Sequence, residues 1–301
     1  MALPEKKTTK AVAGAAVALS GLYGLLIGEV LLARRRIGTT DEVPPLSDGV
    51  YGVDLPGRPV RVLLMGDSTA VGYGMKSAEQ TPAALIGIGL SHLVDAPVDI
   101  RTVAQVGARS SHLRDQIADG RDHRPDLVII IVGANDVTHQ VPPRRAGRLL
   151  AAAIAELRSL GADVVVGTCP DLGTVKQLPQ PLRVAARILS RKMARGQLVA
   201  TLAAGGRAVT LADLLGPLFV SKGDILFGED RFHPSDVGYA TMVSFLNAGA
   251  AASWRERRSE DYAGAPRDYM SVARAATEAS EHGGTQVVRE GRLARVLRRR
   301  R

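Results

Sequence analysis

The chain has 301 residues, of which 46% are hydrophobic and 23% are charged, with 32 glycines and 16 prolines. This composition is typical of a globular protein and excludes a collagen-like or low-complexity chain. A chain of this length can bury a core that needs no covalent crosslinks, and its single cysteine, Cys169, excludes an intramolecular disulfide.

The formal net charge of +9 is concentrated at the two ends of the chain. Residues 1–40 have a net charge of +4 and residues 289–301 a net charge of +6, which leaves −1 for the residues between them. Aromatic residues make up only 4%, so few rings are available to stack on bases. The pattern therefore predicts no nucleic-acid partner and favours an anionic membrane surface beside the basic ends.

The N-terminal region contains an apolar stretch, residues 11–33, with basic residues on both sides and Glu29 as its only charge. As a helix it would be about 35 Å long, enough to cross a bilayer core. No clear small-residue cleavage site follows it, so an uncleaved membrane anchor is favoured over a signal segment, which stays open. We expect residues 1–36 to make the protein membrane-associated or exported. The equal basic charge on both flanks leaves the side of the membrane undecided.

Composition divides the rest of the chain into three parts. Residues 37–58 are rich in proline and glycine without periodicity and are predicted to be a linker. Residues 59–253 are predicted to form the folded domain. Residues 254–301 are predicted to be a polar, Arg-rich extension, whose last part is either a basic amphipathic helix on a membrane or a solvated tail.

Short aliphatic runs alternate with longer helical patterns through the predicted domain. The expected strands are Val60–Met65, Val98–Val103, Leu127–Val132, Val164–Thr168 and Val209–Leu211. The expected helices cover about residues 80–93, 110–120, 144–160, 182–204 and 236–252. Apolar strands separated by helices predict a parallel sheet covered on both faces, and ligands of such sheets bind at the carboxyl ends of the strands.

The first expected strand runs directly into Gly66, Asp67 and Ser68. A serine on a tight strand-to-helix turn exposes its hydroxyl at the edge of the sheet, where a nucleophile for acyl transfer is useful. A plain N-cap serine beside turn glycines is the alternative. The tripeptide alone is weak evidence, and its position after the first strand strengthens it.

The second and third expected strands also end in turns whose residues could take part in catalysis. Gly107, after the second strand, lets a backbone N–H approach a ligand closely, although such a turn is ordinary by itself. The third strand opens into Gly133, Ala134, Asn135 and Asp136. The uncharged amide of Asn135 is suited to donate a hydrogen bond to an oxyanion, and turn or N-cap chemistry is the alternative.

Near the end of the predicted domain, Asp230 precedes His233 by three residues, just ahead of a helix that begins around Pro234. In a turn, this spacing lets the carboxylate reach the imidazole, fix its tautomer and stabilise the imidazolium. The other five histidines lack such a context.

Together, these four segments and their order resemble the SGNH (GDSL-type) hydrolase family. More narrowly, the apolar N-terminal segment and the loop that begins at Cys169 resemble membrane-linked GDSL-type esterases of actinobacteria. The resemblance covers residues 60–252 and implies a three-layer α/β/α fold of the flavodoxin-like type with a five-stranded parallel sheet. Three positions depart from the family pattern, namely Thr69, Thr102 and Gln105.

The resemblance implies a role for each of five residues. Ser68 is the expected nucleophile, His233 the general base and then acid, and Asp230 the partner that orients it. The expected oxyanion hole consists of the Ser68 and Gly107 N–H groups and the Asn135 side chain. The implied enzyme is a serine esterase or lipase that acts on a small-molecule, lipid or glycan ester through an acyl-enzyme.

Two other functions stay open at this stage. An acyltransferase would use the same residues to pass the acyl group to a sugar or lipid hydroxyl, and a non-catalytic membrane-tethered binding protein would have lost the chemistry. Neither a dinucleotide fingerprint, nor a phosphate loop, nor a metal-ligand spacing is present in the sequence, so we expect no cofactor and no metal.

Overall fold

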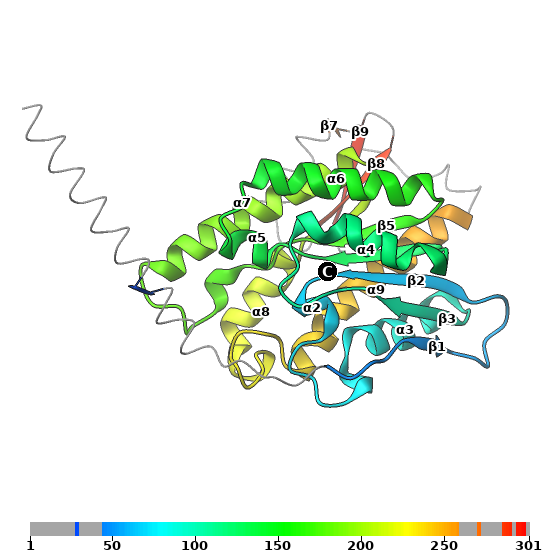
Figure 1. Cartoon of the computed structure of the whole chain (residues 1–301), viewed down its shortest axis with the longest axis horizontal. Helices are drawn as coiled ribbons and strands as arrows, with labels where there is room; N and C mark the ends of the chain where they lie inside the picture. The colour runs from blue at the N-terminus through cyan, green and yellow to red at the C-terminus, as the bar shows by residue number, and fades with distance from the viewer. Residues whose placement is uncertain (1–27, 30–43, 259–269, 272–284, 291–292, 299–301) are drawn as a thin grey trace, which may run out of the picture.

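The structure is a computed structural model that describes residues 28–29, 44–258, 270–271, 285–290 and 293–298. A twisted sheet with helices on both faces forms its centre (Figure 1). Among the described residues, the strand order is β1-β3-β2-β4-β5-β6-β8-β9-β7. The five strands from β3 to β6 are parallel. They are β3 (Val98–Thr102), β2 (Val60–Gly66), β4 (Leu127–Ile131), β5 (Asp163–Gly167) and β6 (Arg207–Val209).

The parallel strands form because their residues are apolar on both faces. β4 reads LVIII and is buried throughout, as expected for the middle of a covered parallel sheet. In β2, Val62 and Leu64 belong to one core cluster, whereas Leu63 and Met65 belong to the cluster on the other face. The prediction of an α/β fold with a five-stranded parallel sheet is confirmed.

Helices cover both faces of the sheet (Figure 1). One face is covered by α3 (Pro82–Val94), α8 (Leu211–Leu226) and α9 (Asp236–Arg258). The other is covered by α4 (Leu113–Gly120), α6 (Pro143–Ser159) and α7 (Leu182–Ala203). Short α2 (Ser68–Val71) and α5 (Ala134–Thr138) begin directly after β2 and β4. Single 3-10 turns complete the inventory: η1 (Ala78–Gln80), η2 (Ser110–His112), η3 (Arg121–His123) and η4 (Leu172–Thr174).

Helix α8 was not predicted from the sequence. This helix of 16 residues contains Pro217, and Lys222 has non-helical backbone angles, so the helical pattern is interrupted twice. It forms nonetheless because Leu211, Leu215 and Phe219 are buried in the core beneath the sheet. Tertiary burial here outweighs weak local propensity.

Two predicted boundaries differ from the structure. The predicted linker, residues 37–58, contains β1 (Gly49–Tyr51), which pairs antiparallel with β3 and so belongs to the sheet. The predicted extension begins at residue 254, but α9 continues to Arg258 and Trp254 is buried in the core. The large indole of Trp254 has enough apolar surface to hold this end of the helix on the sheet.

The C-terminal region also differs from expectation. β8 (Thr285–Glu290) pairs antiparallel with β6, and β9 (Leu293–Arg298) pairs with β8 and with β7 (Met270–Ser271). The amphipathic-helix alternative for this tail is therefore wrong, because its backbone is extended. The predicted membrane segment, residues 1–36, lies outside the described residues except for Gly28 and Glu29. In the described part of the chain, no helix combines the length and apolar character that crossing a bilayer requires.

Candidate active site

The turn between β2 and α2 places Ser68 at the carboxyl end of the sheet. Gly66 has φ +137°, and a side chain there would overlap the carbonyl group of Ile131 on β4, so only glycine lets the two strands approach so closely. Asp67 accepts a hydrogen bond from the Thr69 N–H and caps α2. The chain therefore reverses sharply, and Ser68 becomes the first residue of the helix.

Three polar side chains from two distant segments form a continuous row at this edge. The Ser68 Oγ lies 2.9 Å from His233 Nε2, and His233 Nδ1 lies 2.6 Å from Asp230 Oδ2. The other carboxylate oxygen, Asp230 Oδ1, accepts hydrogen bonds of 2.9 Å from the backbone N–H groups of Phe232 and His233. The structure thus brings together the serine, histidine and aspartate that the sequence singled out, in hydrogen-bond contact.

The Asp230 carboxylate is held in its charged form. Burial acts to raise its pKa, but hydrogen bonds from the His233 ring and from the backbone outweigh burial, so the pKa of Asp230 lies below its ordinary value. A charged carboxylate at Nδ1 keeps the Nδ1 proton on the ring and leaves Nε2 free to accept the serine proton.

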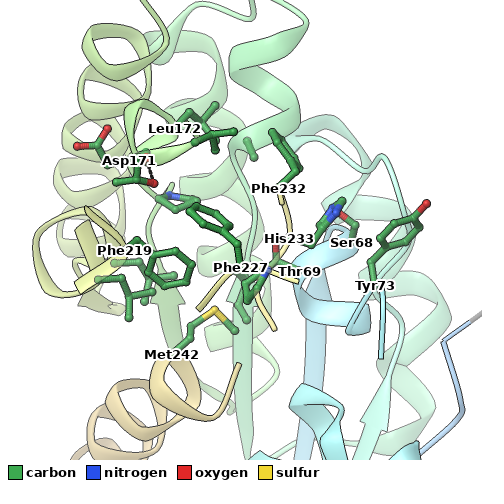
Figure 2. A pocket seen from close by; sticks show the side chains of 18 of the residues that line it. Ser68, Thr69, Tyr73, Asp171, Leu172, Phe219, Phe227, Phe232, His233 and Met242 are labelled. Carbon is green, nitrogen blue, oxygen red and sulfur yellow. Dashed lines mark hydrogen bonds between the residues drawn. The ribbon is translucent and has the colours of Figure 1, made fainter. Parts of the chain in front are cut away.

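Aromatic rings fix the position of the His233 imidazole. The Tyr73 ring lies 4.5 Å from the imidazole, centroid to centroid, and the Phe232 ring lies 5.1 Å from it, nearly perpendicular. The backbone of Tyr73 is itself held, because its carbonyl oxygen accepts a hydrogen bond from the buried Tyr239 hydroxyl. These contacts restrict the imidazole to the orientation in which it faces Ser68 (Figure 2).

Gly107 and Asn135 line the same cavity as Ser68 and His233. Gly107 has φ +80°, and open space surrounds the position of a Cβ. Asn135 is half-buried and lines the cavity, so its side-chain amide can reach a ligand there. The Ser68 and Gly107 loops and the Asn135 turn therefore meet around one space, as the arrangement of an oxyanion hole requires.

Sequence reasoning missed the residues that join these loops. Asp136 is fully buried and accepts hydrogen bonds from the N–H and the hydroxyl of Ser110, so it ties the Asn135 turn to the loop that contains Gly107. Gln116 bonds both the N–H and the carbonyl of Gly66. Gln197 bonds the Val132 carbonyl and the Cys169 N–H. Buried polar side chains on apolar helix faces were the available signal.

The cavity beside Ser68 has a volume of about 270 Å³ and is lined mostly by apolar side chains, among them Leu172 of η4, Phe219 of α8 and Met242 of α9. The chain has only four phenylalanines, and three of them, Phe219, Phe227 and Phe232, line this cavity. All three fall within residues 219–232, and the fold places their rings around the cavity beside Ser68 (Figure 2).

The described residues offer no place for a catalytic metal, since no three histidine, cysteine or acidic side chains gather within reach of one ion. Cys169 is buried, and burial raises the pKa of its thiol well above the ordinary value, which leaves it a poor nucleophile. Ser68 is therefore the nucleophile that this geometry favours.

Comparison with known proteins agrees with this geometry. Residues 64–241 match the profile of the GDSL-like Lipase/Acylhydrolase family. The chain belongs to this family. The GDSL-like esterase Rv1075c of Mycobacterium tuberculosis is 38% identical to this GDSL-family chain over 253 residues, which cover 79% of this chain and 80% of that protein.

Solved structures show the same fold at lower identity. The psychrotrophic esterase EstA from Pseudoalteromonas sp. aligns with a TM-score of 0.52 at 17% identity, over 65% of this chain and 99% of EstA. A lipase/acylhydrolase from Enterococcus faecalis aligns with a TM-score of 0.50 at 19% identity, over 65% of this chain and 96% of that protein. The GDSL-family chain is thus an esterase or acylhydrolase built on the SGNH hydrolase fold.

Proposed function

We propose that this GDSL-family esterase hydrolyses an acyl ester of a lipid or an acylated sugar through an acyl-enzyme formed on Ser68. The observation behind this proposal is the row of hydrogen bonds from Ser68 through His233 to Asp230, at the mouth of an apolar cavity. A hydroxyl, an imidazole and a carboxylate in this order can activate a serine.

In the first half of the reaction, Ser68 Oγ attacks the ester carbonyl while His233 Nε2 takes its proton. The Ser68 and Gly107 N–H groups and the Asn135 amide donate hydrogen bonds to the oxyanion of the tetrahedral intermediate. The bond from the carbonyl carbon to the alcohol oxygen then breaks, and His233 returns the proton to the departing alcohol. Asp230 stabilises the imidazolium in between.

In the second half, a water molecule attacks the acyl-enzyme and gives a proton to His233. The carbon–Oγ bond breaks, the free acid leaves, and the proton passes back to Ser68. The chemistry needs no cofactor because serine, imidazole and amide donors supply nucleophile, base and electrostatic stabilisation.

The test is covalent capture by a fluorophosphonate probe, followed by intact mass spectrometry. The full chain should gain one probe mass on Ser68 and hydrolyse p-nitrophenyl esters, and the Ser68→Ala variant should lose both. Labelling that persists in Ser68→Ala would refute the proposal. Adding glycerol or glucose tests the fate of the acyl group: free acid as the main product supports hydrolysis, and acylated alcohol as the main product would replace hydrolysis with acyl transfer.

A membrane tether at the N-terminus is also proposed, as the sequence predicted. Its support is the apolar stretch of residues 11–33 with basic residues on both sides. Near the end of this stretch, the Glu29 carboxylate accepts a hydrogen bond of 2.8 Å from the N–H of Leu182 at the start of α7, so the part proposed to cross the membrane ends before Glu29. Such a contact would hold the catalytic domain close to the end of the tether. Full-length protein that stays with the lipid fraction after alkaline carbonate washing would support the tether, and release into the supernatant would contradict it.

A further inference from the structure

The cavity at Ser68 continues into a chamber that the proposed chemistry does not use. Figure 2 shows Ser68, His233 and Tyr73 on one side, Phe219 and Met242 on the opposite side, and Phe227 between them. The residues around the far part come from α8, from α9 and from the positions directly after η4 and α8. We call this part the acyl chamber, defined by Val175, Leu211, Leu215, Phe219, Phe227 and Met242.

The walls of the acyl chamber belong to the packed interior. Leu211, Leu215 and Met242 are each at most 5% exposed, so little solvent reaches their side chains. Phe219 and Phe227 make an edge-to-face contact with centroids 4.7 Å apart. An aromatic pair in this geometry packs firmly and gives the far part of the chamber a defined wall.

The polar groups that border the chamber are already engaged. Asp171 accepts hydrogen bonds from the Gly173 N–H and from Arg191 Nε, and the Thr174 hydroxyl donates to the Asp171 carbonyl. A polar ligand would therefore lose its bonds to water without finding partners, whereas an apolar chain would lose nothing and bury its surface. The chamber is suited to a hydrocarbon chain.

Size sets the upper limit of that chain. An apolar cavity of about 150 Å³ holds benzene, with six carbon atoms, so the whole cavity of about 270 Å³, including its part at Ser68, has room for at most roughly ten carbons. We propose that the acyl chamber binds the fatty acyl part of a medium-chain ester, of roughly six to ten carbons, and that the Phe219–Phe227 wall excludes longer chains. This inference rests on the proposed function, because it presumes that the acyl carbonyl sits at Ser68.

Gly216 offers a way to shorten the chamber. It lies within α8 and lines the cavity, and a Cβ built there would lie at ordinary contact distances of 3.8 to 4.0 Å from Asp171 Cβ and Oδ2 and from Arg191 Nη2. Gly216→Leu should fill part of the chamber while favouring the helix. Since each methylene that loses its apolar contact costs about fourfold in kcat/KM, activity on the decanoyl ester should fall at least tenfold and that on the acetyl ester about twofold or less.

Phe219→Ala should have the opposite effect and open the far wall. The kcat/KM for dodecanoyl and hexadecanoyl p-nitrophenyl esters should rise by about tenfold relative to butyrate. Val220→Ala is the matched control, because Val220 is the next residue of α8, is 54% exposed and does not line the cavity. Its chain-length profile should match that of the parent protein.

The outcomes separate this inference from the proposed function. If the parent protein hydrolyses the ester series but Gly216→Leu leaves its chain-length profile unchanged, the chamber is not the acyl site and the inference fails, while hydrolysis at Ser68 stands. If Phe219→Ala unfolds on the loss of its buried ring, the Gly216→Leu result decides alone. If the fluorophosphonate probe does not label the parent protein and the parent protein hydrolyses no ester, the proposed function itself fails.

Discussion

The two ends of the central sheet hold buried carboxylates in opposite electrostatic settings. At the amino end, Asp126 accepts a pair of hydrogen bonds from Arg58 and another from the Arg61 N–H. At the carboxyl end, Asp67 is buried beside the site and accepts a hydrogen bond from the Thr69 N–H. Asp126 is thus paired with arginine, and Asp67 is not.

The pKa values follow this difference. Burial acts to raise the pKa of Asp126, but its bonds to Arg58 and Arg61 outweigh burial and place the pKa well below the ordinary value. Burial raises the pKa of Asp67 to about 6, against weaker opposition from Thr69 and His233. An arginine placed beside Asp67, between Ser68 and His233, would compete with the imidazole for Asp230 and for the developing oxyanion, whereas Arg191 is bonded to Asp171. The Asp126 contacts stabilise the fold at the amino end of the sheet, whereas the side chains around Ser68 at the carboxyl end are placed for the reaction.

The sharpest test of this comparison is Asp230→Asn. An amide at this position cannot stabilise the imidazolium and favours the wrong tautomer of His233, so kcat should fall by about 10⁴-fold. Because the substitution preserves shape, the melting temperature should stay close to that of the parent protein. Measurements of ester hydrolysis and of thermal unfolding check both statements. A fall of less than tenfold would remove Asp230 from the mechanism.

The next effect is expected for Asn135→Ala. Removing one side-chain donor from an oxyanion hole costs about 10²- to 10³-fold in kcat with little change in KM, because the bond forms mainly in the transition state. Steady-state kinetics on a butyrate ester provide the measurement. Thr138→Ala, on the same short helix and also lining the cavity, is the control and should change kcat far less. Equal losses in both variants would contradict a specific donor role.

Asp67→Asn should change how stability depends on pH. The pKa of Asp67 is about 6 in the folded protein, above its ordinary value of 3.8, so the folded state binds the proton more tightly. Its contribution to the free energy of unfolding therefore declines as pH rises from about 4 to 6. Asparagine, which keeps the N-cap, removes this decline and should make the variant more stable at pH 7 by up to roughly 3 kcal/mol. Urea unfolding at pH 4, 5, 6 and 7 measures the difference, which should vanish at pH 4.

The smallest effect is expected for Asp126→Asn, at the amino end. The pKa of Asp126 is lowered in the folded protein, so its contribution is present above pH 4 and is lost as pH falls further. Losing the charged bonds to Arg58 and Arg61 should lower the free energy of unfolding by about 2 kcal/mol at pH 7 and leave kcat unchanged. Urea unfolding and ester hydrolysis measured on one preparation test both. A loss of kcat in a folded variant would show that the two ends are coupled.

Much of the fold could be predicted because the local hydrophobic pattern favours the same strands and helices that the tertiary packing requires. The run Leu127–Val132 is apolar on both faces, and only a central strand or a buried helix satisfies such a pattern. The residues of the Ser68, Asn135 and His233 turns were found because each follows a strand or precedes a helix at a fixed spacing. Functional residues at the ends of strands and helices can therefore be recognised from the sequence.

The features that were not predicted are those that depend on contacts between residues far apart in the chain. α8 forms despite Pro217 because its apolar side is buried beneath the sheet, and β1 forms within a Pro-rich segment because β3 offers a free edge. The roles of Gln116, Asp136 and Gln197 likewise depend on partners that lie between 26 and 65 residues away in the chain. A local sequence pattern cannot reveal hydrogen bonds between residues so far apart.

The sequence by itself determined the parallel sheet, the turns that end its strands and the residue types placed on them, because these depend on periodicity, glycine conformations and short spacings. Only the tertiary structure decided that Ser68 and His233, 165 residues apart, lie within a hydrogen bond of each other. It alone placed side chains of α2, α5, α8 and α9 around one cavity and set the volume of that cavity. The reason is physical: a side chain's direction follows from its own backbone, whereas the volume that it encloses depends on every element packed around it.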